Sequence, residues 1–292
     1  MNAQLIKGAI LGLLCLMISG ALWAANNDTA SIPFDISVHP GGFGRASTAD
    51  ISAVLRSAAD ELWQHCPNTH LAGIDVYHRT DHPQTDLRPG PSGRIAIGLT
   101  AQDTYWAQYS FQFAHELCHA LANYSNNSPP LASYPNRSNL WLEESLCETA
   151  SLFTLRAMSH TWTTAPPFPP WRDYAQWFSS YAKQRVGSRN HDLPLGTAFT
   201  AWFHANELVL RQSSARSDWN VIIAAQLLPI FEKEPRGWGA LAFFHQATTP
   251  NQSLRHCFTK WRARCPRESQ HFVTKPAAVF EVEARASSGE ME

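Results

Sequence analysis

One helix-forming segment constrains the fold of this chain more than any other. From Asp103 to Tyr124 the sequence contains no glycine or proline, and Phe111, Ala114, Leu117 and Leu121 recur at the spacing of one helix face. This pattern predicts a long helix that is buried on one side against other parts of the chain. A chain of 292 residues, of which 44% are hydrophobic, can bury a core around such a helix.

The segments before this helix have the pattern of a small mixed α/β unit. Alternating apolar residues predict strands, helical spacing predicts one further helix, and a run rich in proline and glycine predicts a loop. The expected elements are strands at 34–38, 74–78 and 94–99, a helix at 49–65 that Ser47 or Thr48 can cap, and a loop at 81–93.

The sequence after the first long helix predicts helices only. A second long helix is expected from Leu140 to about His160, and the proline-rich run at 166–170 ends it. The pattern then predicts helices at 171–185, 197–212, 218–233, 237–247 and 251–264. We therefore expect an α+β fold, with a small mixed sheet and a mainly helical C-terminal half. The expected parts are an α/β subdomain at 25–125, a helical subdomain at 126–270 and a tail at 271–292.

The first 24 residues have the composition of a secretory signal peptide. Lys7 supplies a positive charge, Gly8 to Ile18 is apolar, and Ser19 to Ala25 contains the small residues that suit cleavage after Ala24. The apolar run is too short for a comfortable membrane span, which was the alternative. We expect export to the periplasm or the extracellular space, and no membrane partner once the signal is removed.

The cysteines are expected to meet an oxidising environment, in which disulfides can form. Cleavage removes Cys15 and leaves an odd number, so at least one thiol has no partner within the chain: Cys66, Cys118, Cys147, Cys257 and Cys265. Cys118 and Cys147 lie on the two long helices, and a Cys118–Cys147 disulfide is a candidate clip between them. The alternative is two small buried residues.

The charges of the chain are balanced. Its 23 Lys and Arg residues against 24 Asp and Glu residues give a formal net charge of −1. A near-neutral chain gives no reason to expect nucleic acid as a partner.

The first long helix carries the motif His115-Glu116-Leu117-Cys118-His119, which has the form H-E-x-x-H. Residues four apart share one helix face, so both imidazoles can meet one metal ion. Glu116 lies on the same broad face and can reach a water bound to that metal. We expect His115 and His119 to be ligands of one zinc ion and Glu116 to be the general base. The alternative is a surface helix with two solvated histidines.

A tetrahedral zinc site needs a third protein ligand. A third histidine close behind the motif is ruled out, because the positions it would require are occupied by Ala122 and Ser125. The segment from Trp141 to Glu148 offers carboxylates instead, and Glu144 and Glu148 share one helix face. One of the two can bind the metal, while the other accepts a hydrogen bond from a ligand histidine.

The H-E-x-x-H motif, followed by Trp141-Leu142-Glu143-Glu144, resembles the gluzincin group of zinc metallopeptidases, which includes the thermolysin-like and aminopeptidase-like enzymes. The resemblance covers residues 103–155. It implies a zincin-like fold, with Glu144 as the third ligand and Glu148 as the residue that orients the first histidine. Because Glu143 stands where the family usually has Asn, and Ser145 where it has Gly or Ala, Glu143 stays an alternative to Glu144.

The resemblance also implies a strand that pairs with an extended substrate and a residue that stabilises the oxyanion. Residues 94–99 are the expected edge strand, the alternative being a strand inside the sheet. Candidates for the oxyanion residue are Tyr181, His191 and His204, and each of them can equally be a packing or surface residue.

We therefore expect an exported zinc metallopeptidase that acts on a peptide or protein substrate by means of a metal-activated water. The alternatives are a binding or structural protein that keeps the metal without turnover, and a metal-free protein. The sequence indicates neither the substrate, nor exo- or endopeptidase action, nor the oligomeric state.

Overall fold

The structure is a computed structural model, and it describes seven ranges of the chain: 32–67, 69–86, 88–123, 139–188, 192–213, 216–245 and 251–284. The expected signal peptide and His191 lie outside these residues.

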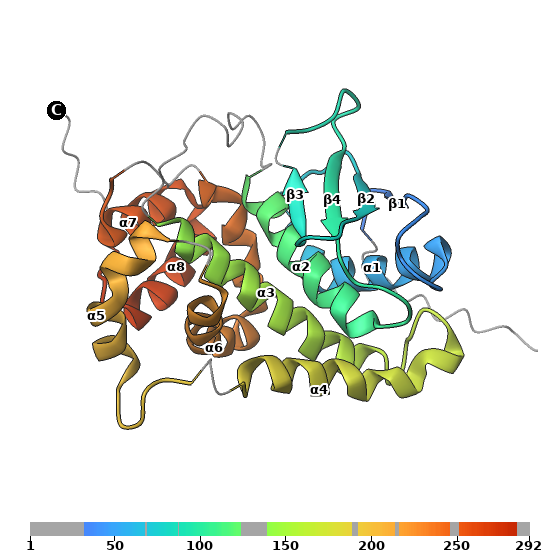
Figure 1. Ribbon diagram of the computed structural model, residues 1–292. Helices are drawn as coiled ribbons and strands as arrows, with labels where there is room; N and C mark the ends of the chain where they lie inside the picture. Colours follow the sequence, from blue (N-terminus) through green and yellow to red (C-terminus); the bar gives the residue numbers. More distant parts are fainter. Residues whose placement is uncertain are drawn as a thin grey trace, which may run out of the picture.

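A four-stranded sheet with the order β1-β2-β4-β3 forms one end of the molecule (Figure 1). Three strands are parallel neighbours: β1 (Ile36–Val38), β2 (Ile74–His78) and β4 (Ile95–Leu99). The fourth strand, β3 (Gln84–Asp86), runs antiparallel to β4 and lies at the edge of the sheet. The sheet is therefore mixed, as the sequence predicted.

The prediction of residues 94–99 as the edge strand is wrong. β4 hydrogen-bonds to β2 on one side and to β3 on the other, so it is an interior strand. Its edge neighbour β3 lies inside the segment expected to be a loop. With only three residues, Gln-Thr-Asp, β3 is too short and too polar to show an alternating hydrophobic pattern.

Two helices pack beneath the sheet. Helix α1 (Thr48–Trp63) is capped at its N-terminus by Ser47, whose side chain accepts a hydrogen bond from the backbone N–H of Asp50. Helix α2 (Trp106–Asn123) is the long helix predicted from the absence of glycine and proline, and it lies against β3, β4 and α1. The apolar face expected for it, which includes Leu117 and Leu121, is buried.

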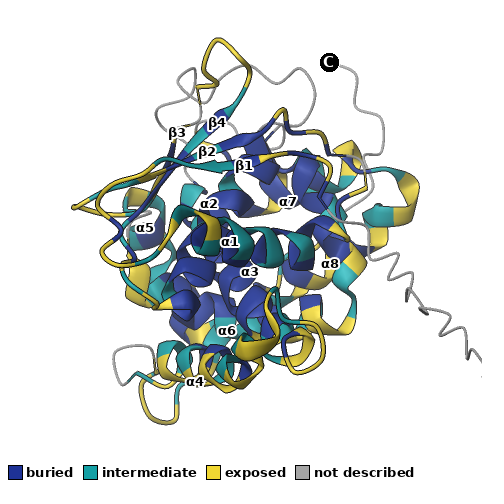
Figure 2. Ribbon diagram, turned by 90° about the vertical axis from the view of Figure 1, so that its right-hand side faces the viewer, coloured by how far each residue is buried: buried dark blue, intermediate teal, exposed yellow. Residues whose placement is uncertain are grey.

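Helix α3 (Leu140–Thr161) runs through the middle of the molecule, beside α2, and contacts α1, α4 and α6 as well (Figure 2). Because it is surrounded by other helices, apolar residues occur all round it, and not on a single stripe. Trp141 at its start and Leu146 one turn later are both completely buried.

The elements described after α3 are all helical, and α4, α5 and α6 among them contact α3. They are η2 (Pro169–Tyr174), α4 (Ala175–Val186), α5 (Phe199–Gln212), α6 (Ser217–Lys233), η4 (Pro235–Phe243), α7 (Leu254–Arg264) and α8 (Arg267–Val279). The segment expected at 237–247 is the 3-10 helix η4.

Two observations bear on the expected division of the chain. The segment expected to be a tail from residue 271 begins inside α8, and Phe272, Val273 and Ala277 of this helix are buried in the core. The two expected subdomains share one continuous hydrophobic core, because α2 and α3 pack side by side across the boundary between them.

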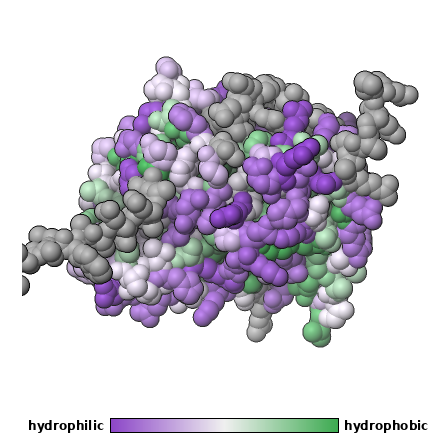
Figure 3. Space-filling model, turned by 180° about the vertical axis from the view of Figure 1, so that it is seen from behind, coloured by the Kyte–Doolittle hydropathy of each residue, from purple (hydrophilic) through white to green (hydrophobic). Residues whose placement is uncertain are grey.

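The outside of the molecule is mixed in polarity. Seen from behind, polar side chains predominate and apolar ones are scattered between them (Figure 3). Within the described residues, none of the helices combines the length and the hydrophobicity that a membrane span needs.

The central position of α3 predicts a sharp contrast between two Leu→Ala substitutions in helices. Leu146→Ala, at a fully buried position of α3, should lower the free energy of unfolding by about 2–5 kcal/mol. Leu208→Ala in α5, where the side chain is 74% exposed, should change it by less than about 0.5 kcal/mol. Chemical denaturation followed by circular dichroism measures both, and equal losses would contradict this packing.

Candidate metal centre

Helix α2 places the two histidines of the H-E-x-x-H motif on one face, one turn apart. Their rings lie 5.1 Å apart between centroids. The Nε2 atom of His115 is 3.3 Å from Oε2 of Glu144, and the Nε2 atom of His119 is 3.6 Å from the same oxygen. Three atoms that zinc accepts as ligands therefore face one another.

Glu144 comes from helix α3, and the side-by-side packing of α2 and α3 brings it to the histidines. Burial opposes the ionised form of its carboxyl group, but His119 and His115 outweigh this effect and hold the pKa of Glu144 well below its usual range. Burial also opposes a charge on His119, yet Glu144 and Glu143 together hold the pKa of that imidazole well above its ordinary value. Without a metal, a proton on His119 is the counter-charge at this point, and a metal ion would displace it.

Glu143 lies behind His119 and faces its other ring nitrogen. Oε1 of Glu143 is 3.0 Å from Nδ1 of His119, and the side-chain amide of Asn123 donates a 2.7 Å hydrogen bond to the same oxygen. The side chain of Glu143 is only 1% exposed. Of the two alternatives that the sequence left open, Glu144 is thus the one that faces both Nε2 atoms, whereas Glu143 can fix the ring orientation of His119.

Glu148 takes the corresponding place behind His115, as expected, although less closely. One of its oxygens is 3.8 Å from Nδ1 of His115, which is longer than a hydrogen bond. Its other oxygen accepts a 3.0 Å hydrogen bond from Arg185 of helix α4. The guanidinium group of Arg185 also lies over the ring of Phe111, at 4.7 Å. Arg185 could not be predicted from the sequence, because α4 is distant in the chain and bears no motif.

Glu116, the expected general base, is held by the edge strand. Its side chain points to Thr85 of β3, whose Oγ1 lies 2.8 Å from Oε2 and 2.9 Å from the backbone oxygen of Glu116. Both residues are buried, with Glu116 5% exposed. Sequence reasoning missed Thr85, since it lies in the segment expected to be a loop.

A cavity of about 300 Å³ opens in front of these groups. Its walls come from β3 and the residues just before it, from α2, and from the start of α3: His82, Pro83, Gln84, Thr85, His115, Glu116, His119, Leu140, Glu143 and Glu144. The expected ligands and the expected base therefore share one cavity.

Of the expected oxyanion residues, the two that the structure describes do not line this cavity. Tyr181 lies on α4 and lines a different cavity, and His204 lies on α5, 3.2 Å from Glu281. The cavity is also lined by His82, which lies between β2 and β3 and was not among the expected site residues. A search downstream of Glu144 could not find it, because it precedes the motif in the chain.

The thiols of Cys118 and Cys147 meet beneath the site. Both are buried free cysteines, and the expected disulfide between them is not formed in this structure. The sulfur of Cys147 also lies within 4.8 Å of ligand nitrogens of His115 and His119. Burial and the neighbouring thiol raise the pKa of Cys147 well above its ordinary value, so it is a neutral thiol here, and Glu144 is the anionic donor.

Known proteins give no guide to this site. Comparison of the chain with protein-family models, with curated proteins and with solved structures found no match.

Proposed function

We propose that this protein is an exported zinc metallopeptidase of zincin-like fold, which hydrolyses peptide bonds in a peptide or protein substrate. The observation that carries the proposal is the convergence of His115 and His119 on one oxygen of Glu144, with the carboxylate of Glu116 in the same cavity. Export is inferred from the first 24 residues alone.

The residues of the site fit zinc. Two imidazole nitrogens and one carboxylate oxygen form the donor set of known catalytic zinc sites, and both histidines have a carboxylate near the other ring nitrogen. His115, His119 and Glu144 would hold the ion. When bound there, zinc supplies a Lewis acid that acidifies water and polarises a carbonyl group.

Glu116 is the proton carrier of the proposed reaction. Its carboxylate takes a proton from the attacking water and then gives it to the amine nitrogen that leaves. The carboxylate is almost fully enclosed, so bulk water competes little for the proton. His82 lines the same cavity, and we propose that it donates a hydrogen bond to the oxygen on which negative charge develops.

Strand β3 is the proposed docking edge for the substrate, in place of β4. It is a terminal strand of the sheet, and Gln84 and Thr85 line the cavity. An extended peptide can add to such an edge by backbone hydrogen bonds, which would place one of its carbonyl groups in the cavity.

Thr85 is the residue that we propose to position the base. Its hydroxyl has one proton but lies within hydrogen-bond distance of two oxygens of Glu116. When Glu116 is ionised, the hydroxyl can donate to the carboxylate. When Glu116 carries the proton, the hydroxyl can donate to the backbone oxygen and accept from the carboxyl group. Thr85 thus fits both states that the reaction requires.

The proposed ligand set predicts graded effects on metal binding. The purified mature chain should hold about one zinc ion, and Glu144→Ala should lose it, since one of three ligands is gone. Glu143→Gln should weaken zinc affinity by about 10- to 100-fold, because it only orients His119. Metal analysis and titration calorimetry measure this, with His204→Ala as the control. If Glu143→Gln lost the metal and Glu144→Ala kept it, the two roles would be exchanged.

The proposed base predicts a separation of metal binding from turnover. Glu116→Gln should keep zinc but lower kcat on a peptide substrate by at least about 100-fold, because the amide cannot accept the proton. Glu281→Gln, far from the cavity, is the matched control. Unchanged turnover of Glu116→Gln would remove Glu116 from the mechanism. A zinc-loaded wild type that cleaves nothing in a broad peptide library would favour the non-catalytic alternative.

The role of Thr85 can be tested with two substitutions, one that removes the hydroxyl group and one that keeps it. Thr85→Val removes the hydroxyl and should lower kcat by about 10- to 100-fold at nearly constant KM, because the base is no longer fixed. Thr85→Ser keeps the hydroxyl and should recover most of the rate. Both variants should bind zinc like the wild type, and a crystal structure of Thr85→Val should show the Glu116 carboxylate displaced. A carboxylate that stays in place would contradict the role.

A further inference from the structure

A second cavity, of about 220 Å³, lies between the first turn of α2 and helix α4. It is lined by Tyr105, Ala107, Gln108, Tyr174, Trp177, Ser180, Tyr181 and Gln184. Four of these residues are aromatic, and the polar ones are two amides and a hydroxyl. None of the lining residues carries a formal charge at neutral pH.

The walls of this cavity are fixed by packing. The hydroxyl of Tyr174 accepts a 3.1 Å hydrogen bond from the backbone N–H of Ala107. The ring of Tyr181 packs edge-on against Phe111, which lies one turn before His115 on α2. The cavity therefore joins α4 to the helix that carries the candidate metal ligands.

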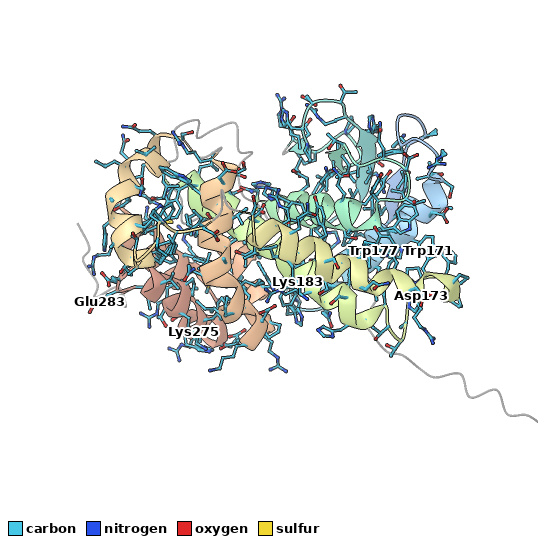
Figure 4. The ribbon with its side chains drawn as sticks, turned by 60° about the horizontal axis from the view of Figure 1, so that its bottom comes forward. Trp171, Asp173, Trp177, Lys183, Lys275 and Glu283 are labelled. Carbon is cyan, nitrogen blue, oxygen red and sulfur yellow. The ribbon has the colours of Figure 1, made fainter. Side chains whose placement is uncertain are left out.

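The rim, in contrast, is open. Tyr105 is 64% exposed and Trp177 is 57% exposed, and these are among the few large apolar side chains that reach the surface in the described part of the chain. Figure 4 labels Trp177 on α4, close to Trp171. Exposed aromatic residues beside a cavity are typical of surfaces that bind another molecule.

The cavity lies on the same side of α2 as the candidate metal centre. Gln108 precedes His115 by seven residues, which is close to two full turns, so the two side chains leave the helix in nearly the same direction. At 1.5 Å per residue the separation along the axis is about 10 Å. An extended peptide advances about 3.3 Å per residue, so this distance corresponds to about three residues.

The size and chemistry of the cavity favour one kind of occupant. Pockets for drug-sized ligands measure about 300–1,000 Å³, so this cavity suits a single side chain. A charged side chain would lose hydration without gaining an ionic partner. An aromatic ring can pack against the tyrosines and Trp177, while the amides of Gln108 and Gln184 can meet its polar edge or backbone.

We propose that this cavity is a specificity subsite that binds one aromatic side chain of the substrate, about three residues from the bond that is cleaved. The inference rests on the proposed peptidase function, because only a bound peptide makes the separation of about 10 Å between Gln108 and His115 correspond to three substrate residues. It implies that the enzyme acts within longer peptides, because a dipeptide cannot reach from the metal centre to the cavity.

Binding can be measured without any catalytic activity. Using Glu116→Gln protein, N-acetyl-tryptophanamide should bind saturably at one site in NMR titrations, and N-acetyl-lysinamide should not. Trp177→Ala and Tyr105→Ala should each weaken the binding of the tryptophan probe by about 10-fold or more, since each removes one wall. Tyr77→Ala, an exposed aromatic position on β2, is the matched control and should change nothing.

Cleavage gives the second measurement. Peptides with one varied position should be cut faster when Trp, Tyr or Phe lies three residues from the cleaved bond than when Lys or Glu does, and Trp177→Ala should reduce this preference by about 10-fold. Cleavage without such a preference, together with no probe binding, would overturn the subsite and leave the peptidase proposal standing. Probe binding by a protein that cleaves no peptide would overturn the peptidase proposal and leave an aromatic-binding cavity. Binding of a saccharide in place of the aromatic probe would also overturn the subsite.

Discussion

The contact between helices α2 and α3 is the feature on which the rest of the structure depends. It joins the sheet end of the molecule to the helical half in one hydrophobic core. At the same time, it sets Glu144 opposite His115 and His119, so that the structural centre and the candidate metal centre lie on the same pair of helices. A shift of one helix along the other would therefore disturb both the core and the ligand set.

This helix pair buries several polar groups, among them Glu116, Asn123, Glu143 and Glu148. Short hydrogen bonds join Glu143 to both Asn123 and His119. Glu148 accepts a hydrogen bond from Arg185 and lies 3.8 Å from His115. Burying such groups costs free energy that apolar residues of similar size would not cost. A protein that needed only a stable helix pair would have little reason to retain them, and this argues for a chemical role of the site.

Much of the fold could be predicted from the sequence, because hydrophobic spacing along α1, α2, α3 and most later helices is regular. The shared face of His115 and His119 could be predicted for a similar reason, from helix geometry, whereas Glu144 was singled out by the family resemblance. What could not be predicted depends on contacts between distant segments. Strand β3 has no pattern of its own and exists because β4 pairs with it.

The residues around the ligands were hidden from the sequence for the same reason. Thr85 and His82 reach the cavity only because β3 folds over α2, and Arg185 reaches Glu148 only because α4 packs against α3. The different positions of Glu143 and Glu144 around the histidines also became visible only in the structure, because two adjacent glutamates of one helix are chemically alike and differ only in the direction of their side chains. Helix α8 begins directly after Pro266, and because proline occurs at the start of a helix as well as after its end, the sequence pattern left this segment open.

The enclosure of α3 has a consequence for the order in which the protein matures. Glu143 and Glu144 take their places only when α3 is enclosed by its neighbouring helices, and the clamp on Glu116 exists only when β3 has joined the sheet. An unfolded chain would offer the two histidines and none of this arrangement. The cluster around the histidines is therefore complete only after the chain has folded, so any metal affinity that depends on it is a property of the folded state.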